Sequence, residues 1–214
     1  MITDASIFVG ACDVGLGVFA ARDLAPGQTI LIFRGPRVEH DDPIHHTPLG
    51  ANLLQTGTRT YIMPEPPGVL VNHSCDPNAG LVGNRHLVAL RPIAAGQEIR
   101  YDYSTTMADG LWSLACRCGA PGCRRTVGDF RDLPPEVRDR YLRLGAVQGF
   151  IARGNRSRPP DAARTAAGLM PRERPAGTAR PVPQGAQLRC PGQTLISIEK
   201  APPCAGEPDP VGSP

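Results

Sequence analysis

Two short clusters of polar residues carry side chains of the types that metal sites and active sites use. The first reads N-H-S-C-D-P-N over residues 72–78, and the second reads C-x-C-x4-C over residues 116–123. Three thiolates at the second spacing can bind one ion, because a Gly-Ala-Pro-Gly turn brings the third cysteine back toward the first two. The second cluster therefore predicts a zinc site.

A structural zinc site needs a fourth ligand. Cys75 in the first cluster is the best candidate, because Cys190 and Cys204 lie in a proline-rich tail and Cys12 lies beside a glycine turn. A chance cluster or a redox pair of cysteines is the alternative. An odd total of seven cysteines, three of them in one loop, favours a metal site in a reducing compartment over a set of disulfides.

Two further motifs could contribute to a site. In an extended Y-D-Y segment, Tyr101 and Tyr103 point to the same face and could line a channel, although core packing is the ordinary explanation. The segment G-L-G-V-F-A at residues 15–20 fits a dinucleotide fingerprint, but the Pro-Gly turn at residues 26–27 leaves no room for the helix that this fingerprint requires. Its glycines form either a hairpin turn or a close backbone approach to a ligand.

The elements that must position these motifs are mainly short strands. Apolar runs at residues 30–33, 68–71 and 86–90 are bounded by Gly, Pro or Asn, which favours strands. Residues 21–31 and 90–100 share the pattern [LI]-A-x-G-Q-x-I, which predicts a strand, a tight glycine turn and a second strand in each. One helix is predicted late in the chain, with Asp132 as its cap and its end at Gly145.

Composition separates a folded part from a tail. The chain has 214 residues, of which 41% are hydrophobic and 5% aromatic. No aromatic residue follows Phe150, so residues 154–214 cannot bury enough surface to offset their ordering entropy, and we expect a disordered linker rather than a functional arm.

Charge and hydropathy exclude several classes of partner. Residues 1–153 carry 15 arginines against 15 acidic residues, so the net charge of +3 comes from the tail and argues against nucleic-acid binding. The sequence has neither a signal-peptide pattern nor an apolar run that could span a bilayer, so we expect a cytoplasmic protein with no membrane partner.

Taken in order, the motifs resemble those of SET-domain protein lysine methyltransferases that carry a post-SET zinc motif. The resemblance covers residues 7–127: G-x-G at 15–17, N-H-S-C-x-P-N at 72–78, G-x-E-[IL]-x-[FY]-D-Y at 96–103 and C-x-C-x4-C-R at 116–124. It implies a mainly β SET fold of the β-clip type, in which the segment after D-Y passes under a loop near N-H-S-C and forms a pseudoknot. A zinc loop, one C-terminal helix and the tail complete the expected chain.

The resemblance also implies two bound groups, S-adenosyl-L-methionine as methyl donor and a structural Zn²⁺ ion. Residues of the glycine turn and of N-H-S-C are implied to bind the donor: Gly15, Leu16, Gly17, Asn72 and His73. His73 would meet the adenine largely through its backbone and is not implied as a metal ligand. The implied zinc ligands are Cys75, Cys116, Cys118 and Cys123.

The implied reaction is in-line methyl transfer to a deprotonated lysine of a protein substrate. Tyr103 stands at the position of the catalytic hydroxyl. Tyr101 stands at the Phe/Tyr position that limits how many methyl groups are added, and its hydroxyl predicts mono- or dimethyl-lysine. The 22 arginines against one lysine indicate a GC-rich, bacterial-like genome, so a histone substrate should not be assumed.

The chain departs from the family pattern in two places. Phe33 stands where many relatives have a channel tyrosine, and Tyr61 is a candidate replacement for the lost hydroxyl. No aromatic residue follows Cys123 closely, so Trp112 is the candidate for packing against the adenine, with ordinary packing as the alternative.

We therefore expect a monomer with a SET domain at 1–110, a post-SET zinc segment at 111–128, a helical region at 129–153 and the tail at 154–214. A catalytically silent SET fold that acts as a zinc-stabilised interaction module is the main rival. It predicts erosion of Asn72, His73 or Tyr103, and all three are present. A thiol redox protein is the other rival, and it leaves N-H-S-C unexplained.

Overall fold

Short strands dominate the computed structural model, which describes residues 6–156. The strands are β1 (Ile7–Cys12), β2 (Gly15–Ala20), β3 (Thr29–Ile32), β4 (Arg37–Glu39), β5 (Leu54–Gly57), β6 (Thr60–Ile62), β7 (Asn72–His73), β8 (Ala79–Val82), β9 (His86–Ala89), β10 (Arg100–Tyr101), β11 (Leu114–Ala115) and β12 (Thr126–Val127). The α-helices are α1 (Pro135–Leu144) and α2 (Gly149–Arg156). The 3-10 helices are η1 (Pro43–His46), η2 (Pro48–Asn52), η3 (Gly68–Leu70), η4 (Tyr103–Thr105) and η5 (Phe130–Asp132).

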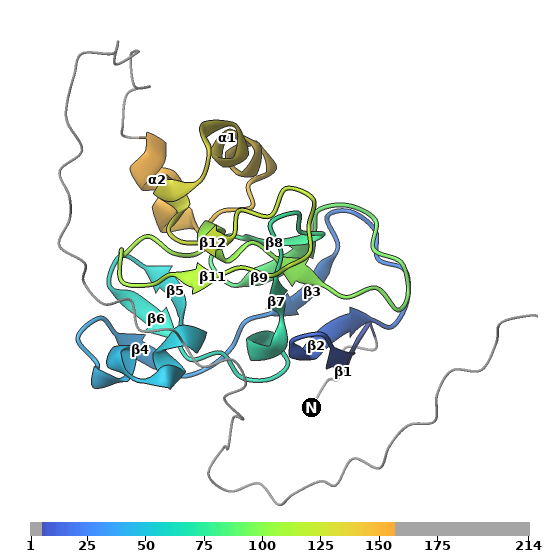
Figure 1. The fold of residues 1–214 in the computed structure, drawn as a ribbon, viewed down its shortest axis with the longest axis horizontal. Helices are drawn as coiled ribbons and strands as arrows, with labels where there is room; N and C mark the ends of the chain where they lie inside the picture. Colours follow the sequence, from blue (N-terminus) through green and yellow to red (C-terminus); the bar gives the residue numbers. More distant parts are fainter. Residues whose placement is uncertain (1–5, 157–214) are drawn as a thin grey trace, which may run out of the picture.

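The strands form several small sheets instead of one large one. Antiparallel sheets have the orders β1-β2, β11-β12, β3-β9-β8 and β4-β6-β5. The remaining pair, β7 and β10, is parallel and places Arg100 opposite Asn72 and Tyr101 opposite His73. This pairing sets Y-D-Y beside N-H-S-C, as the pseudoknot requires, while the threading itself stays a prediction. Figure 1 shows α1 and α2 together at one end of the molecule, away from β1 and β2.

The two segments with the repeated pattern pair with each other. Leu24 and Ile93 exchange backbone hydrogen bonds of 2.8 and 3.0 Å across an antiparallel bridge. Each segment then turns at a glycine with positive φ, 81° at Gly27 and 79° at Gly96. The predicted turn is confirmed in both. The second strand is confirmed as β3 in the first segment, whereas in the other it is reduced to a bridge at Glu98 and the start of β10, and the first strand of each is reduced to the single bridge.

Three clusters of buried side chains hold these elements together. The largest lies among the small sheets and includes Val18, Ile30, Leu81, Leu87 and Ile99, each 0% exposed. The second joins α1 and α2 to η5. The third is a small cluster of Val38, Leu53 and Tyr61 beside η1. The main cluster packs against the strands that carry N-H-S-C and Y-D-Y.

The predicted strand at residues 68–71 is wrong, because this run forms η3. Pro67 precedes it with φ −83° and ψ −5°, a helical backbone that starts a 3-10 turn. The strand predicted at 86–90 is confirmed as β9 and that at 30–33 as β3. Residues 15–20 form β2, so no helix follows the glycines and the dinucleotide reading is excluded.

The late helix is confirmed as α1, which ends at Gly145 with φ 64°. Its N-cap is Pro134, not the predicted Asp132, which instead ends η5. The second helix α2 was not predicted, and it includes residues 154–156, which the sequence had assigned to the tail. The rest of the predicted tail, 157–214, lies outside the described residues. Within residues 6–156 no helix is long and apolar enough to cross a membrane.

Candidate active site

Two cavities of different size meet at Tyr103. A groove of about 800 Å³ runs along the β1-β2 turn, β7 and the cysteine loop, and its lining includes Gly15, Asn72, His73 and Tyr103. A pocket of about 70 Å³ lies among η2, η3 and the Y-D-Y segment. Since Tyr103 lines both cavities, molecules bound in the two would approach each other at this residue.

The Asn72 side chain joins β7 to the glycine turn at one side of the groove. Its amide nitrogen Nδ2 donates to the backbone oxygen of Leu16 at 3.0 Å and to Oε1 of Glu98 at 2.8 Å, and it lies 3.4 Å from Sγ of Cys12. Gly15 opens β2 with φ 115°, a conformation that favours glycine, and a Cβ there would meet no atom within 4 Å. The backbone of the turn is therefore open to a ligand in the groove.

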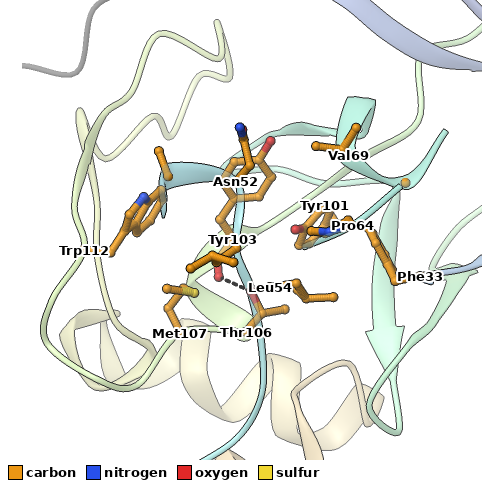
Figure 2. A pocket seen from close by; sticks show the side chains of 13 residues that line it. Phe33, Asn52, Leu54, Pro64, Val69, Tyr101, Tyr103, Thr106, Met107 and Trp112 are labelled. Carbon is orange, nitrogen blue, oxygen red and sulfur yellow. Dashed lines mark hydrogen bonds between the residues drawn. The ribbon is translucent and has the colours of Figure 1, made fainter. Parts of the chain in front are cut away.

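The small pocket is lined mainly by aromatic and aliphatic side chains. Ring centroids form a continuous series, with Phe33 5.8 Å from Tyr101, Tyr101 4.8 Å from Tyr103 and Tyr103 6.1 Å from Trp112. Figure 2 shows the two tyrosines between Trp112 on one side and Phe33 on the other. A narrow cavity with these walls suits an unbranched aliphatic chain better than a charged group.

Tyr103 is held by contacts from both directions. Its hydroxyl donates to the backbone oxygen of Val71 at 3.0 Å, and its backbone N–H donates to Nδ1 of His73 at 3.2 Å. Burial raises the pKa of the Tyr103 hydroxyl well above its usual range. At neutral pH the group is therefore a fixed, uncharged hydroxyl, which can orient a reactant but cannot act as a base of moderate strength.

Asp102 lies between the two tyrosines in sequence and points into the protein instead of the pocket. Its carboxylate is 0% exposed and accepts from Arg124 Nη2 at 2.7 Å, Tyr141 Oη at 2.9 Å and the backbone N–H of Ser104 at 3.1 Å. These bonds connect Y-D-Y to the residue after the cysteine loop and to α1. Asp102 thereby fixes the backbone from which Tyr101 and Tyr103 project.

The cysteine loop closes over the end of β7. β11 and β12 pair as Leu114 with Val127 and Ala115 with Thr126, so the ends of the loop lie side by side. Sγ of Cys75 lies 3.7 Å from Sγ of Cys116, and Sγ of Cys118 accepts from the backbone N–H of Cys75 at 3.4 Å. Burial alone raises the pKa of Cys118, but hydrogen bonds from backbone N–H groups and neighbouring thiols outweigh it and lower this pKa to about 6.

His73, Cys75, Cys116 and Cys118 form one cluster that could hold a metal ion, with one ligand atom from each within 4.8 Å of the others. Cys123 adjoins it through hydrogen-bond contacts with the side chains of Cys116 and Cys118. The sequence proposed Cys123 and not His73 as a ligand, so the structure brings five candidates together where four were expected.

The tautomer of His73 discriminates among these five. Nδ1 accepts from the N–H of Tyr103, and burial lowers the pKa of the ring to about 4, so at neutral pH the single ring proton is on Nε2. Nε2 lies 3.4 Å from Sγ of Cys75 and is positioned to donate to it. A nitrogen that carries a proton has no lone pair for a metal, which favours the four sulfur atoms as ligands.

Residues 15–104, which include Gly15, Asn72, His73, Tyr101 and Tyr103, match the family model described as SET domain. The chain contains a SET domain. Its mainly β architecture of small antiparallel sheets and its cysteine cluster agree with a SET fold followed by a post-SET loop. The SET domain that the sequence motifs predicted is thus confirmed over residues 15–104.

Several curated proteins named as histone-lysine N-methyltransferases are similar to part of the chain. Human histone-lysine N-methyltransferase 2B is 44% identical over 62 residues, covering 26% of this chain and 2% of its own length. Histone-lysine N-methyltransferase ash1 of Drosophila melanogaster is 35% identical over 135 residues, covering 54% of this chain and 6% of its own length. The chain therefore spans only a small part of these relatives.

A solved structure is also similar in part. The humanized mutant of the Chaetomium thermophilum Polycomb Repressive Complex 2 bound to the inhibitor GSK126 has 19% sequence identity to this SET-domain chain and a TM-score of 0.43. The similarity covers 47% of this chain and 15% of that one.

Most of the residues that the sequence proposed for binding the methyl donor or for catalysis lie around the groove and the pocket. Gly15, Asn72, His73 and Tyr103 line the groove, and Tyr101 lines the pocket. Their roles stay predictions. The two remaining residues of the glycine turn lie beside Asn72: Leu16 through its backbone oxygen and Gly17 through its proximity to the Asn72 amide.

Two proposed replacements are placed differently from their expected sites. Trp112 lines the small pocket and is not among the residues of the groove, so its position favours contact with the pocket's occupant over contact with an adenine. Tyr61 is 0% exposed, donates to Oδ2 of Asp109 at 2.7 Å and does not line the pocket. It therefore does not replace the hydroxyl that Phe33 lacks.

Sequence reasoning missed three residues that support the site: Glu98, Asp102 and Arg124. Glu98 and Asp102 both belong to the matched G-x-E-[IL]-x-[FY]-D-Y motif, so their places in that motif were an available signal. Arg124 directly follows the last cysteine of the loop. Its partner Asp102 lies 22 residues earlier, and no local pattern connects the two.

Proposed function

We propose that the chain is an S-adenosyl-L-methionine-dependent protein-lysine N-methyltransferase. The observation that carries this proposal is the single residue shared by two cavities, a large groove and a narrow pocket that meet at Tyr103. The names of the SET-domain relatives, which are histone-lysine N-methyltransferases, support the same reaction class. A protein that bears a lysine is the proposed substrate, and it need not be a histone.

The groove fits the proposed donor. A bound S-adenosylmethionine would supply a methyl group on a positively charged sulfur. Asn72 and the glycine-turn backbone would hold its methionine part, and the backbone of His73 would meet its adenine. The volume of about 800 Å³ is sufficient for a ligand of this size.

The pocket fits the proposed acceptor. The aromatic and aliphatic side chains around it disfavour the charged form of an amine, whose ordinary pKa is about 10.4 for lysine. Tyr103 would orient the amine through its neutral hydroxyl, and Tyr101 would limit the space for added methyl groups, so mono- or dimethyl-lysine is the proposed product. Alignment of two reactants is worth up to roughly 7–11 kcal/mol of the barrier.

The cysteine cluster fits a structural zinc ion held by Cys75, Cys116, Cys118 and Cys123. Zinc bonds thiolates at about 2.3 Å, which places two sulfurs of a tetrahedral site about 3.8 Å apart. The 3.7 Å between Cys75 and Cys116 agrees with this separation. The ion would hold the cysteine loop against β7, beside the groove, with no part in the chemistry. A cytoplasmic location and a monomeric state also stay predictions.

The activity is tested by incubating the full chain with S-adenosylmethionine carrying an isotopically labelled methyl group and with a host lysate. Mass spectrometry of digested proteins then locates the label. We expect labelled lysines with wild-type protein and none with Asn72→Ala. Label that appears on no lysine, or equally with both proteins, contradicts the proposed activity.

A further inference from the structure

Glu98 accepts a hydrogen bond from Asn72 but lines neither the groove nor the pocket. It stands two residues before Arg100, which lies opposite Asn72 in the parallel pair β7-β10. Only 9% of the Glu98 side chain is exposed, against 30% of the Arg100 side chain. A carboxylate this buried needs specific partners, because its removal from water is costly.

The two oxygens of Glu98 have different partners. Oε1 accepts from Nδ2 of Asn72 at 2.8 Å. Oε2 accepts from Nε of Arg100 at 2.6 Å and also contacts Nη2 of the same guanidinium. Arg100 in turn donates from Nη1 to the backbone oxygen of Cys118 at 3.3 Å. A continuous series of contacts therefore runs from Asn72 through Glu98 and Arg100 to the cysteine loop.

This arrangement determines which end of the Asn72 amide faces the groove. A carboxylate only accepts hydrogen bonds, so Glu98 can bind the amide nitrogen of Asn72 and not its oxygen. The backbone oxygen of Leu16 imposes the same orientation. The oxygen Oδ1 is then the Asn72 atom available to a hydrogen-bond donor, such as the ammonium group of an amino acid.

Gly17 makes the close approach possible. A Cβ at this position would lie 2.6 Å from Oε1 of Glu98 and 3.2 Å from Nδ2 of Asn72. Any other residue at position 17 would separate the carboxylate from the amide or displace both. The second glycine of G-x-G thus serves the Glu98–Asn72 contact.

We propose that Glu98 is a positioning residue for donor binding: it fixes the Asn72 amide with its oxygen toward the groove, and Arg100 holds Glu98 in place. The inference rests on the proposed function, because it assigns the ammonium of the donor's methionine part as the group that Asn72 Oδ1 recognises. Glu98 itself need not touch the donor.

The test compares two ligands by isothermal titration calorimetry with the full chain. S-adenosylhomocysteine carries the amino-acid ammonium, whereas 5′-methylthioadenosine lacks the whole amino-acid part. In Glu98→Gln, an amide that can rotate replaces the fixed acceptor and the charge on Arg100 loses its partner. We expect S-adenosylhomocysteine to bind about tenfold more weakly and 5′-methylthioadenosine to bind as in wild type.

Glu39→Gln is the matched control. Glu39 pairs with Arg37 at 2.6 Å and the same two-residue spacing, but both side chains are more than half exposed and neither lines the groove. This variant should leave both affinities unchanged. If Glu98→Gln does not fold by circular dichroism, Glu98→Asp withdraws the carboxylate from Asn72 and keeps the charge, and the same selective loss is expected.

The outcomes separate this inference from the proposed function. Unchanged affinity of S-adenosylhomocysteine in a folded Glu98 variant overturns the positioning role alone. An equal loss for both ligands also overturns it, because it indicates a general structural effect on the groove. Wild-type protein that binds neither ligand contradicts the proposed function itself.

Discussion

The groove and the pocket differ in size, in the side chains that line them and in the way in which the chain builds them. The groove of about 800 Å³ is assembled from the glycine turn, β7 and the cysteine loop, and charged side chains such as Asp13, Arg100 and Arg117 line it. The pocket of about 70 Å³ is built around one row of rings that begins at Phe33. One cavity suits a large ligand with both apolar and charged parts, and the other suits a thin aliphatic chain.

Because the two cavities would bind different reactants, methyl transfer between them requires a wall that both cavities share. A large donor and a narrow acceptor can be recognised independently, but methyl transfer requires that their reacting atoms meet. Tyr103 belongs to the walls of both cavities. The neighbouring Asp102 holds this segment in place by accepting hydrogen bonds from Arg124 and Tyr141. Substitutions in the groove, at the shared wall and in the pocket should therefore have separable effects.

The largest expected effect is the loss of donor binding in the groove. Asn72→Ala removes the amide that connects β7 to the glycine turn, and we expect it to abolish donor binding, with affinity for S-adenosylhomocysteine at least about 100-fold weaker. Calorimetry measures this loss, and circular dichroism should show an intact fold. Asn84→Ala, at an exposed position outside both cavities, is the control and should bind normally. Normal binding by Asn72→Ala would mean that the groove is not the donor site.

A change at the shared wall should separate binding from turnover. Tyr103→Phe removes one positioned hydroxyl, so we expect turnover to fall by about a hundredfold while donor affinity stays nearly constant. Single-turnover kinetics and calorimetry give the two quantities. Full activity in this variant would contradict the catalytic assignment of Tyr103.

Loss of the metal should loosen the cysteine loop, which forms part of the groove wall. We predict one zinc per chain, and Cys118→Ser should lose it and loosen the loop at 116–125, because the free energy of metal binding is here local folding free energy. Elemental analysis measures zinc, and hydrogen exchange measures loop opening. Cys12→Ser should keep its zinc, since Cys12 lies beside Asn72 and outside the sulfur cluster. Wild-type protein without zinc would remove this prediction.

The smallest effect on rate is expected within the pocket. The Tyr101 hydroxyl shares a hydrogen bond with the Thr106 side chain and could hold a water beside the amine, at a cost of about 0–2 kcal/mol. Tyr101→Phe should then raise the methylation state with little change in rate. Mass spectrometry of a modified peptide decides the outcome. Trimethyl-lysine as the main wild-type product would show that Tyr101 does not restrict the pocket.

The sequence predicted the site better than the elements that support it. N-H-S-C and the three loop cysteines are compact motifs whose chemistry depends on short spacings, so Cys75 could be placed with Cys116 and Cys118 before any fold was known. The buried Asp102 contacts residues 22 and 39 positions away, and only tertiary packing defines such distances. The position of Trp112 beside the pocket could not be read from the sequence for the same reason, since the course of the loop after η4 decides which cavity the ring lines.

Local backbone geometry accounts for the other errors. Residues 68–71 have the apolar character of a strand, but the preceding Pro67 adopts a helical conformation and turns the chain before β7. The helix α2 is short, and Ile151 is its buried residue in the second cluster. Eight residues with so few apolar positions give little periodic signal.

The central claim is that donor and acceptor sites meet at Tyr103, and a bisubstrate ligand tests it most directly. In this ligand a nitrogen replaces the donor's sulfur and carries an aminoalkyl chain of lysine length, and the matched control carries a methyl group instead. Because one molecule would fill both cavities, we predict that it binds about 100-fold more tightly than the control. Equal affinity for the two compounds would show that the groove and the pocket are not connected for methyl transfer.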